Sequence, residues 1–159
     1  MAEIELRASV NGRVVYARVP ARLLLADFLR NNLGLTGTKV SCGMQVCGAC
    51  TVVVDDQPVS ACAYLACDID GREVTTVEGL APAGELTPLQ RAFVDCSALQ
   101  CGFCTAGFVM AATALLRENP QPTEDEVTHY LEGNLCRCTG YIPIVDAVLH
   151  AAGQGQTDE

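Results

Sequence analysis

The sequence is poor in lysine and in aromatic residues. Its 159 residues carry a net charge of −9, and Lys39 is the only lysine. Binding to nucleic acid takes a basic stripe that faces phosphate, so the composition argues against this class of protein. Half of the residues are hydrophobic but only 5% are aromatic, and there is no tryptophan. Aliphatic side chains must therefore fill the interior.

Signals for membrane insertion and for substrate chemistry are also missing. No apolar run approaches the roughly 20 residues that span a bilayer, and the N-terminal residues do not resemble a signal peptide. We expect no membrane span and a cytoplasmic protein, unless it is exported with a partner. There is no G-x-G-x-x-G turn, no phosphate loop and no Ser-His-Asp set. The chain therefore has no recognisable site for a flavin, a nicotinamide or an organic substrate.

What the chain has in abundance is cysteine, with ten residues in total. Cys42, Cys47 and Cys50 have the spacing C-x4-C-x2-C, and Cys62 follows. This is the plant-type pattern for a [2Fe–2S] cluster. The glycines that follow the first two cysteines would let the backbone wrap closely around such a group.

A second group of four cysteines consists of Cys101, Cys104, Cys136 and Cys138. We expect each pair to lie directly before a helix, where free N–H groups and the helix dipole favour negative charge. Eight of the ten cysteines thus form two groups of four. Our hypothesis is a protein that holds two iron–sulfur clusters and conducts electrons between them, with donor and acceptor on other chains.

Other uses of these cysteines fit the sequence less well. Disulfides would require an oxidising compartment, for which the sequence has no signal. Structural zinc could use either group, but the C-x-C pair and the C-x4-C-x2-C loop fit zinc patterns poorly. Cys67 and Cys96 lie outside both groups, and we expect them to be small buried hydrophobic residues. We interpret His129 and His150 as surface or packing residues.

The first half of the sequence alternates strand signals with one helix. Strands are predicted over residues 4–8, 14–19, 51–54, 59–62 and 72–77, with hairpin turns at Asn11-Gly12 and at 55–58. Helical spacing of apolar residues runs from Leu23 to Leu29. These elements predict a small mixed sheet with one packed helix, a β-grasp arrangement, in a domain of residues 1–79.

The second half predicts only helices. Residues 80–85 have linker composition, and helices are expected over 88–96, 105–117 and 124–131 and after Gly140. Thr87 and Thr123 are the expected N-caps, and Thr123 begins a capping box. The fold class is therefore α+β, with an all-α four-helix domain over residues 80–159. The polar tail, residues 153–159, is expected to be disordered.

The motifs together resemble the small iron–sulfur subunit of the molybdenum hydroxylases, the family of xanthine dehydrogenase, aldehyde oxidoreductase and carbon monoxide dehydrogenase. The resemblance covers about residues 3–152. Its carriers are Leu35-Thr36-Gly37-Thr38-Lys39, Cys47-Gly48-Ala49-Cys50-Thr51-Val52, Thr75-Thr76-Val77-Glu78-Gly79-Leu80, Gln100-Cys101-Gly102-Phe103-Cys104-Thr105 and Gly133-Asn134-Leu135-Cys136-Arg137-Cys138-Thr139-Gly140-Tyr141.

The resemblance implies a plant-type ferredoxin domain followed by the family's helical [2Fe–2S] domain. The implied ligands are Cys42, Cys47, Cys50 and Cys62 for the first cluster and Cys101, Cys104, Cys136 and Cys138 for the second. In relatives, electrons pass from a molybdenum–pterin centre on a large subunit to the helical-domain cluster. They continue to the ferredoxin-like cluster and then to FAD on a medium subunit. The implied assembly is a dimer of three-chain units.

Two residues match positions that lie against the pterin edge in relatives, namely Gln100 and Cys138. Three others depart from the family pattern. Ser41 and Gln45 stand where glycine is common, and Ala106 replaces a usual proline. None of these removes a cysteine. The rival hypothesis is a free two-cluster ferredoxin that carries electrons by diffusion. The substrate stays open, because its pocket would lie on another chain.

Overall fold

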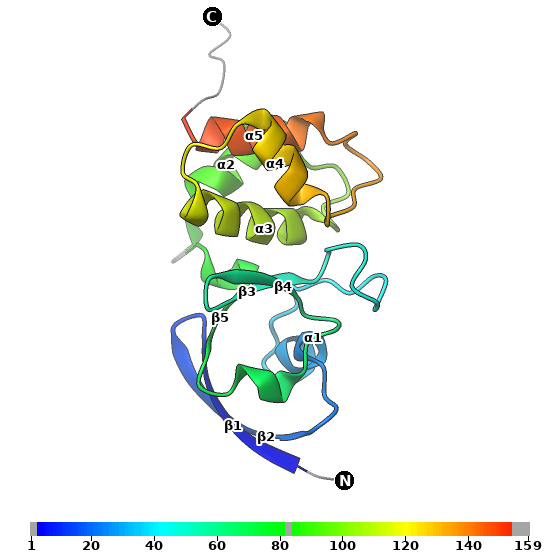
Figure 1. Ribbon diagram of the computed structural model, residues 1–159, viewed down its shortest axis with the longest axis vertical. Helices are drawn as coiled ribbons and strands as arrows, with labels where there is room; N and C mark the ends of the chain where they lie inside the picture. Colours follow the sequence, from blue (N-terminus) through cyan, green and yellow to red (C-terminus); the bar gives the residue numbers. More distant parts are fainter. Residues whose placement is uncertain (1–2, 82–83, 154–159) are drawn as a thin grey trace, which may run out of the picture.

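The computed structural model describes residues 3–81 and 84–153. The chain forms a sheet domain and a helical domain, stacked along the long axis of the molecule (Figure 1). The predicted tail beyond Gly153 and two residues of the predicted linker lie outside the described residues. Within those residues, no helix has the length and apolar character needed to cross a membrane.

Five strands form one mixed sheet, in the order β2-β1-β5-β3-β4. They are β1 (Glu3–Val10), β2 (Arg13–Pro20), β3 (Thr51–Val54), β4 (Gln57–Ser60) and β5 (Glu73–Thr75). β1 and β5 are parallel, and the other neighbouring pairs are antiparallel. The predicted hairpin turn is confirmed, because Asn11 and Gly12 both have positive φ. This is the expected β-grasp arrangement.

The first helix differs from its prediction. It begins at Leu25 as α1 (Leu25–Asp27) and continues as one π-helical turn, η1 (Phe28–Asn32). Leu23 and Leu24 are not helical, because their backbone pairs with the segment after Cys62. The Leu23 carbonyl accepts from the Ala66 N–H at 2.8 Å, and Leu24 forms a β-bridge with Leu65. A distant segment thus overrides the helical spacing.

The turn between β3 and β4 is also shorter than predicted. Asp55 and Asp56 both have positive φ and make the turn alone, so β4 begins at Gln57 and not at Val59. Pro58 is tolerated there because β4 is an edge strand. β5 is shorter than predicted, and the 3-10 turns η2 (Ala66–Ile69) and η3 (Val77–Gly79) were not predicted.

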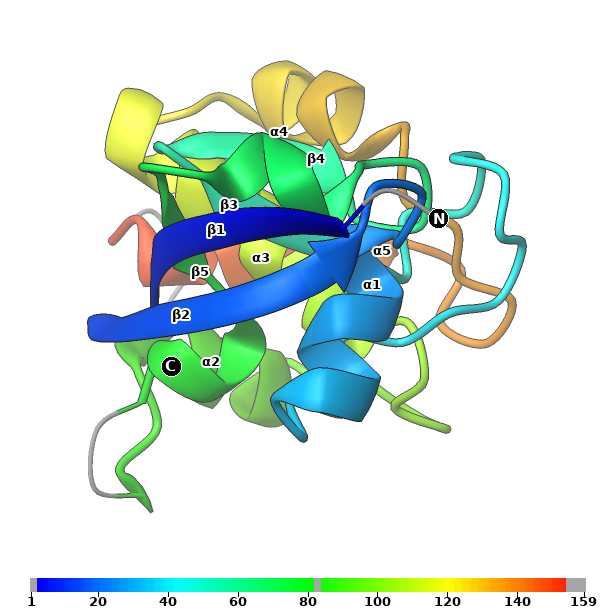
Figure 2. The same cartoon turned by 90° about the horizontal axis from the view of Figure 1, so that it is seen from below.

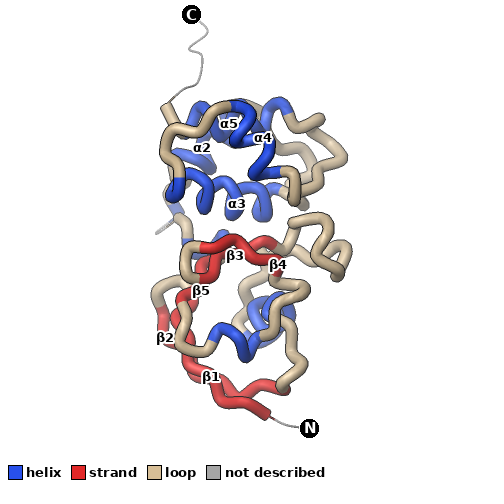
Figure 3. Tube along the Cα trace, viewed as in Figure 1, coloured by secondary structure: helices blue, strands red, loops and turns tan. Residues whose placement is uncertain are grey.

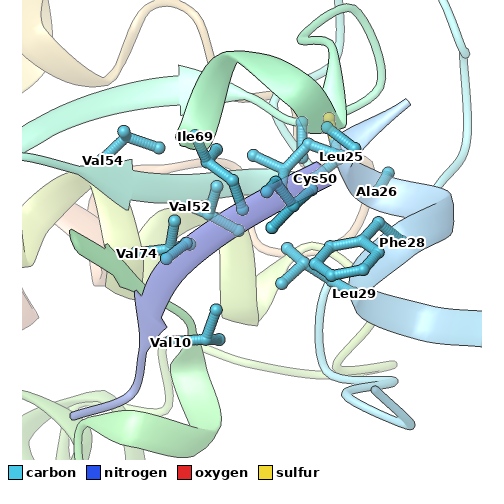
Figure 4. Close-up of a cluster of buried hydrophobic side chains, with 14 of the residues drawn as sticks. Val10, Leu25, Ala26, Phe28, Leu29, Cys50, Val52, Val54, Ile69 and Val74 are labelled. Carbon is cyan, nitrogen blue, oxygen red and sulfur yellow. The ribbon is translucent and has the colours of Figure 1, made fainter. Parts of the chain in front are cut away.

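Aliphatic residues fill the core of the sheet domain, as the composition requires. Side chains from α1, η1, β3, β5 and η2 converge there (Figure 4). Phe28 is the one phenylalanine in this buried set, and it packs among Leu25, Leu29 and Val52. The core thus holds the helix against one face of the sheet.

The second domain contains the four predicted helices (Figure 3). They are α2 (Pro88–Asp95), α3 (Thr105–Glu118), α4 (Glu124–Leu131) and α5 (Ile142–Ala151). Both α2 and α4 begin with a complete capping box, at Thr87 and Thr123 respectively. α3 has the most buried residues of the four helices, because it packs on both the other helices and the sheet.

The two domains are joined by a small apolar contact between α3 and β3. Helix α3 lies beside β3 where the domains meet (Figures 1 and 2). Val53 of β3 packs against Met110 and Ala114 of α3, and all three are buried. Met110 thus packs into the contact between the two domains. An exposed ion pair of 3.2 Å joins Arg117 to Asp56 at the edge of this contact.

Candidate metal centres

The first four cysteines lie close to the start of β3 and the end of β4. Cys50 lies just before β3, and Cys62 lies two residues after β4. Antiparallel pairing brings these ends together, and the Ala61 N–H donates to the Cys50 carbonyl at 3.3 Å. The Cys50 thiol contacts that of Cys62, and the Cys42 thiol contacts that of Cys47. Cys50 and Cys62 are buried, whereas Cys42 and Cys47 are half-buried.

Backbone N–H groups surround the first thiol of this loop. Those of Met44 and Val46 each lie 3.4 Å from the Cys42 sulfur. Their hydrogen bonds lower the pKa of the Cys42 thiol to about 6. At the buried end of the loop the effect is opposite, because burial raises the pKa of Cys50 to about 12. The loop therefore stabilises negative charge at Cys42.

The other four cysteines meet in the helical domain as two pairs. The sulfurs of Cys101 and Cys138 lie 3.6 Å apart, and both residues are exposed. Cys104 contacts Cys136. Cys104 is the N-cap of α3, as predicted. The prediction for the other pair is wrong, because Cys138 lies four residues before the first residue of α5.

A loop replaces the expected helix terminus around Cys136. The Thr139 hydroxyl lies 3.2 Å from the Cys136 sulfur, and the N–H groups of Cys138 and Thr139 lie 3.4 Å from it. Burial raises the pKa of Cys136, but these hydrogen bonds outweigh it and the pKa falls to about 7. The pKa of Cys104 rises to about 12, first through burial and then through its contact with Cys136. Thr139 was not singled out from the sequence.

Each group of four thiols supplies the donor set that a two-iron cluster takes. Tetrahedral zinc requires four ligands around one point. Among residues 3–81 and 84–153, no group of three or more His, Cys, Asp or Glu side chains is placed to hold one ion. A [2Fe–2S] cluster has two irons and takes four thiolates, two for each iron. Paired thiols within each group suit that donor set.

The two predicted pterin contacts lie side by side. The Gln100 side-chain amide donates to the Cys138 carbonyl at 3.1 Å, and both residues are exposed. Large apolar side chains are also exposed on the same loops, at Phe103 and Leu135, and at Ile142, the first residue of α5. The thiol pair of Cys101 and Cys138 is thus exposed to solvent, and the loops that carry it also expose apolar side chains.

The loops that carry the two thiol groups touch each other, on the same side of the molecule in both views (Figures 1 and 2). The Leu135 N–H donates to the Cys47 carbonyl at 2.9 Å. The buried Asn134 amide donates to the Gly48 carbonyl at 3.0 Å. Asn134 lies in one of the motifs that carry the family resemblance. No role is predicted for it from the sequence, because its partner lies 86 positions away.

The remaining candidates stand apart from both groups. Cys67 and Cys96 are half-buried, so the prediction that they are buried is wrong. The Cys67 thiol lies 3.7 Å from the Ala21 carbonyl, at the edge of the sheet domain. His129 is a surface residue, as predicted, and lies 3.4 Å from Glu132. His150 is also exposed, at the end of α5.

Comparisons with known families match both halves of the chain. Residues 8–81 match a family described as a 2Fe-2S iron-sulfur cluster binding domain, and residues 76–149 match a [2Fe-2S] binding domain. The nicotine 6-hydroxylase small subunit of Paenarthrobacter nicotinovorans is 56% identical over 95% of this chain and 91% of the relative. The nicotinate dehydrogenase small FeS subunit of Eubacterium barkeri is 42% identical over 95% and 96%.

Solved structures agree with these relatives. Quinoline 2-oxidoreductase from Pseudomonas putida 86 superposes with a TM-score of 0.89 at 46% identity, over 96% of this chain and 98% of the other. The aldehyde oxidoreductase from Desulfovibrio gigas superposes with a TM-score of 0.91 at 44% identity. That match covers 94% of this chain but 17% of the other chain, which is much longer.

Proposed function

Since the chain belongs to the family of small iron–sulfur subunits of molybdenum hydroxylases, we propose that it carries electrons from a molybdenum–pterin centre on a large subunit to FAD on a medium subunit. It is an electron-transfer subunit of a multi-subunit oxidoreductase, with two [2Fe–2S]-binding domains. In the proposed order, the helical domain receives electrons first and the sheet domain passes them on. The main support is that two groups of four thiols lie on loops that touch.

The proposed ligands are the eight grouped cysteines. Cys42, Cys47, Cys50 and Cys62 would hold one cluster, and Cys101, Cys104, Cys136 and Cys138 the other. A bound [2Fe–2S] cluster supplies one-electron redox chemistry. The N–H groups around Cys42 and the hydroxyl at Cys136 stabilise thiolate charge. Burial of Cys50 and Cys62 keeps water from the inner side of the first group.

The exposed thiol pair of the helical domain is the proposed side for the large subunit. Cys138 and Gln100 are the candidate contacts to the pterin, and their hydrogen bond holds them together. Leu135, on the loop that carries Cys138, is 49% exposed, and Ile142, four residues after Cys138, is 72% exposed. Apolar patches of this kind on a protein surface mark contacts with partners. A subunit that docks here would bring its pterin toward the exposed pair.

The loop of the first thiol group is the proposed side for the medium subunit. Met44 is 69% exposed and Val46 is 56% exposed, and both lie between Cys42 and Cys47. A partner that covers this loop would bring FAD near the first cluster. We further propose the assembly of the three subunits as a dimer of three-chain units.

The proposed substrate class for the complex is an N-heterocycle. The similar proteins described above include enzymes named for nicotine, nicotinate and quinoline, which all contain a ring nitrogen. The substrate pocket would lie on the large subunit. Aldehydes are the second class to test, because a similar solved structure is named an aldehyde oxidoreductase. Reduction of the purified complex by nicotine, nicotinate and a simple aldehyde, followed in the visible spectrum, distinguishes these classes.

Iron content and EPR test the electron-transfer proposal directly. We expect about four iron atoms per chain, two in each cluster, and two distinguishable [2Fe–2S] signals after reduction. We also expect the chain to co-purify with a molybdenum-containing and a flavin-containing subunit. Zinc without iron would overturn the proposal. A stable holoprotein that occurs alone and exchanges electrons with unrelated donors would support the diffusible carrier instead.

Replacing Cys138 tests the proposed second cluster. Serine in Cys138→Ser keeps the size but weakens iron binding, so we expect an altered helical-domain EPR signal and slower reduction by substrate. The matched control is Cys96→Ser, because Cys96 is a half-buried cysteine outside both groups. Stopped-flow reduction and EPR measure both effects. Unchanged signals and rates in Cys138→Ser would count against its role as a ligand.

A further inference from the structure

One carbonyl in the first thiol loop receives donors from both domains. The Gly48 carbonyl accepts from the Thr51 N–H at 3.1 Å and from the Thr51 hydroxyl at 2.7 Å. It also accepts from the side-chain amide of Asn134, at 3.0 Å, across the domain boundary. Asn134 is only 6% exposed, so water cannot easily replace this donor.

The backbones around this carbonyl approach so closely that side chains are excluded. Gly48 has φ of +67°, and a Cβ there would lie 2.5 Å from the Asn134 amide nitrogen. A Cβ at Gly107 of α3 would collide with the Gly48 carbonyl oxygen. The neighbouring carbonyl, that of Cys47, is held by the Leu135 N–H. Successive residues of the helical domain therefore hold successive carbonyls of the first loop.

The direction of this carbonyl determines the direction of the next N–H. A trans peptide is planar, so its C=O and its N–H point in opposite directions. With the Gly48 carbonyl held by Asn134 and Thr51, the Ala49 N–H lies on the opposite side of this peptide. Ala49 is buried and lies between Cys47 and Cys50, whose thiols both belong to the first group. The orientation of the Gly48–Ala49 peptide therefore sets which way the Ala49 N–H faces within the loop between the two cysteines.

We propose that Asn134 is a positioning residue for the first cluster, which raises the reduction potential of that cluster from the other domain by orienting the Gly48–Ala49 peptide. An N–H dipole aimed at cluster sulfurs favours the reduced state, which carries one more negative charge. This inference rests on the proposed function. It adds that domain docking influences the reduction potential of the first cluster. The helical domain would therefore bind the second cluster and also tune the first.

The test compares Asn134→Leu with the wild-type holo complex in an EPR-monitored redox titration. Leucine keeps the branched shape but cannot donate, and it adds no charge. We expect the equilibrium constant for reduction of the first cluster to fall about tenfold, which is about 59 mV for one electron. The second cluster should keep its potential. The signal of the first cluster is identified as the one that Cys42→Ser alters.

Three further measurements keep the outcome decisive. Asn119→Leu is the matched control, because Asn119 is a half-buried residue of the same domain whose amide donates to Glu126 and not to the first thiol loop. Asn134→Ala is the second variant if leucine hinders folding. Iron content is measured first, because absence of iron in the wild type would overturn the proposed function itself. With iron present, unchanged potentials in both Asn134 variants, or equal shifts of both clusters, would overturn this inference alone.

Discussion

At the scale of single residues, the first thiol loop depends on left-handed backbone positions. Gly43, Gln45 and Gly48 all have positive φ, between 61° and 67°. Gln45 is the only one of the three with a side chain, and this conformation costs such a residue about 1–2 kcal/mol. The sequence comparison with the family marked position 45 as unusual, and the backbone supplies the physical reason.

We expect Gln45→Gly to stabilise the holoprotein by at most about 1 kcal/mol. Relief of the left-handed conformation is partly offset by the larger entropy of glycine in the unfolded chain. Thermal unfolding and the rate of cluster loss measure the effect. The matched control is Met44→Gly at the neighbouring exposed position, where φ is not positive. That variant should be less stable than wild type. The same change in both variants would contradict the argument.

At the scale of elements, side chains close in sequence cap the first turns of α2 and α4. Thr123 and Glu126 at the start of α4 form a reciprocal capping box, in which the Thr123 N–H donates to the Glu126 carboxylate at 2.7 Å. This bond and that from the Thr123 hydroxyl hold the pKa of Glu126 below its usual value of 4.5. The two residues are three positions apart in sequence, which is why this capping box could be predicted without a structure, whereas at Thr87 only the N-cap was predicted and not the reciprocal bond of Gln90.

The lowered pKa of Glu126 makes part of the stability of the helical domain depend on pH. A carboxyl group whose pKa is lower in the folded state stabilises fully above its unfolded pKa, here about 4.5. That contribution is lost as the pH falls through the folded value. We expect Glu126→Gln to be less stable than wild type at pH 7, and the difference to shrink below pH 4.5. Urea unfolding followed by circular dichroism at several pH values measures it.

The control for this prediction is Glu124→Gln at the first position of the same helix. Glu124 is exposed and is not the residue that closes the capping box. Its substitution should change stability less, and with a weaker pH dependence. A stability difference for Glu126→Gln that stays constant from pH 7 to below pH 4.5 would refute the assignment.

Elements whose limits depend on distant pairing were predicted less well. The spacing of Leu23 to Leu29 predicted a regular helix, but the backbone of Leu23 bonds to Ala66. The turn was predicted to span residues 55–58, but it contains only Asp55 and Asp56. Pro58 lies within β4 because β4 is an edge strand of the sheet. Cys136 and Cys138 were expected at a helix start, whereas Tyr141 is the N-cap of α5. In each case tertiary contacts overruled a local pattern.

At the scale of the whole molecule, the two domains meet at a contact that leaves no room for a side chain at Gly107. Gly107 of α3 faces the Gly48 carbonyl and the Ala49 Cα, both of which are backbone atoms. Backbone cannot move aside as a flexible side chain can. The contact also joins the two thiol loops through Asn134 and Leu135. Packing at one helical glycine therefore affects how the thiol groups sit relative to each other.

We expect Gly107→Ala to destabilise the protein by about 1–3 kcal/mol, because overpacking outweighs the better helix propensity of alanine. The two domains should also unfold less cooperatively. Calorimetry of the holoprotein measures both quantities. Gly133→Ala is the matched control, since a Cβ there meets no atom within 4 Å. A Gly107→Ala variant as stable as wild type would show that the contact is looser than described.

The sequence alone determined the α+β class, the two groups of cysteines and the capping box of α4, because spacing and side-chain chemistry within short segments suffice for these features. It also identified the family, since several motifs occur together along the chain. Only the tertiary structure decided how the thiols pair and which residues join the two domains. The bond between Asn134 and Gly48 joins positions 86 apart. No local pattern predicts such a contact, because it exists only once both domains have folded and docked.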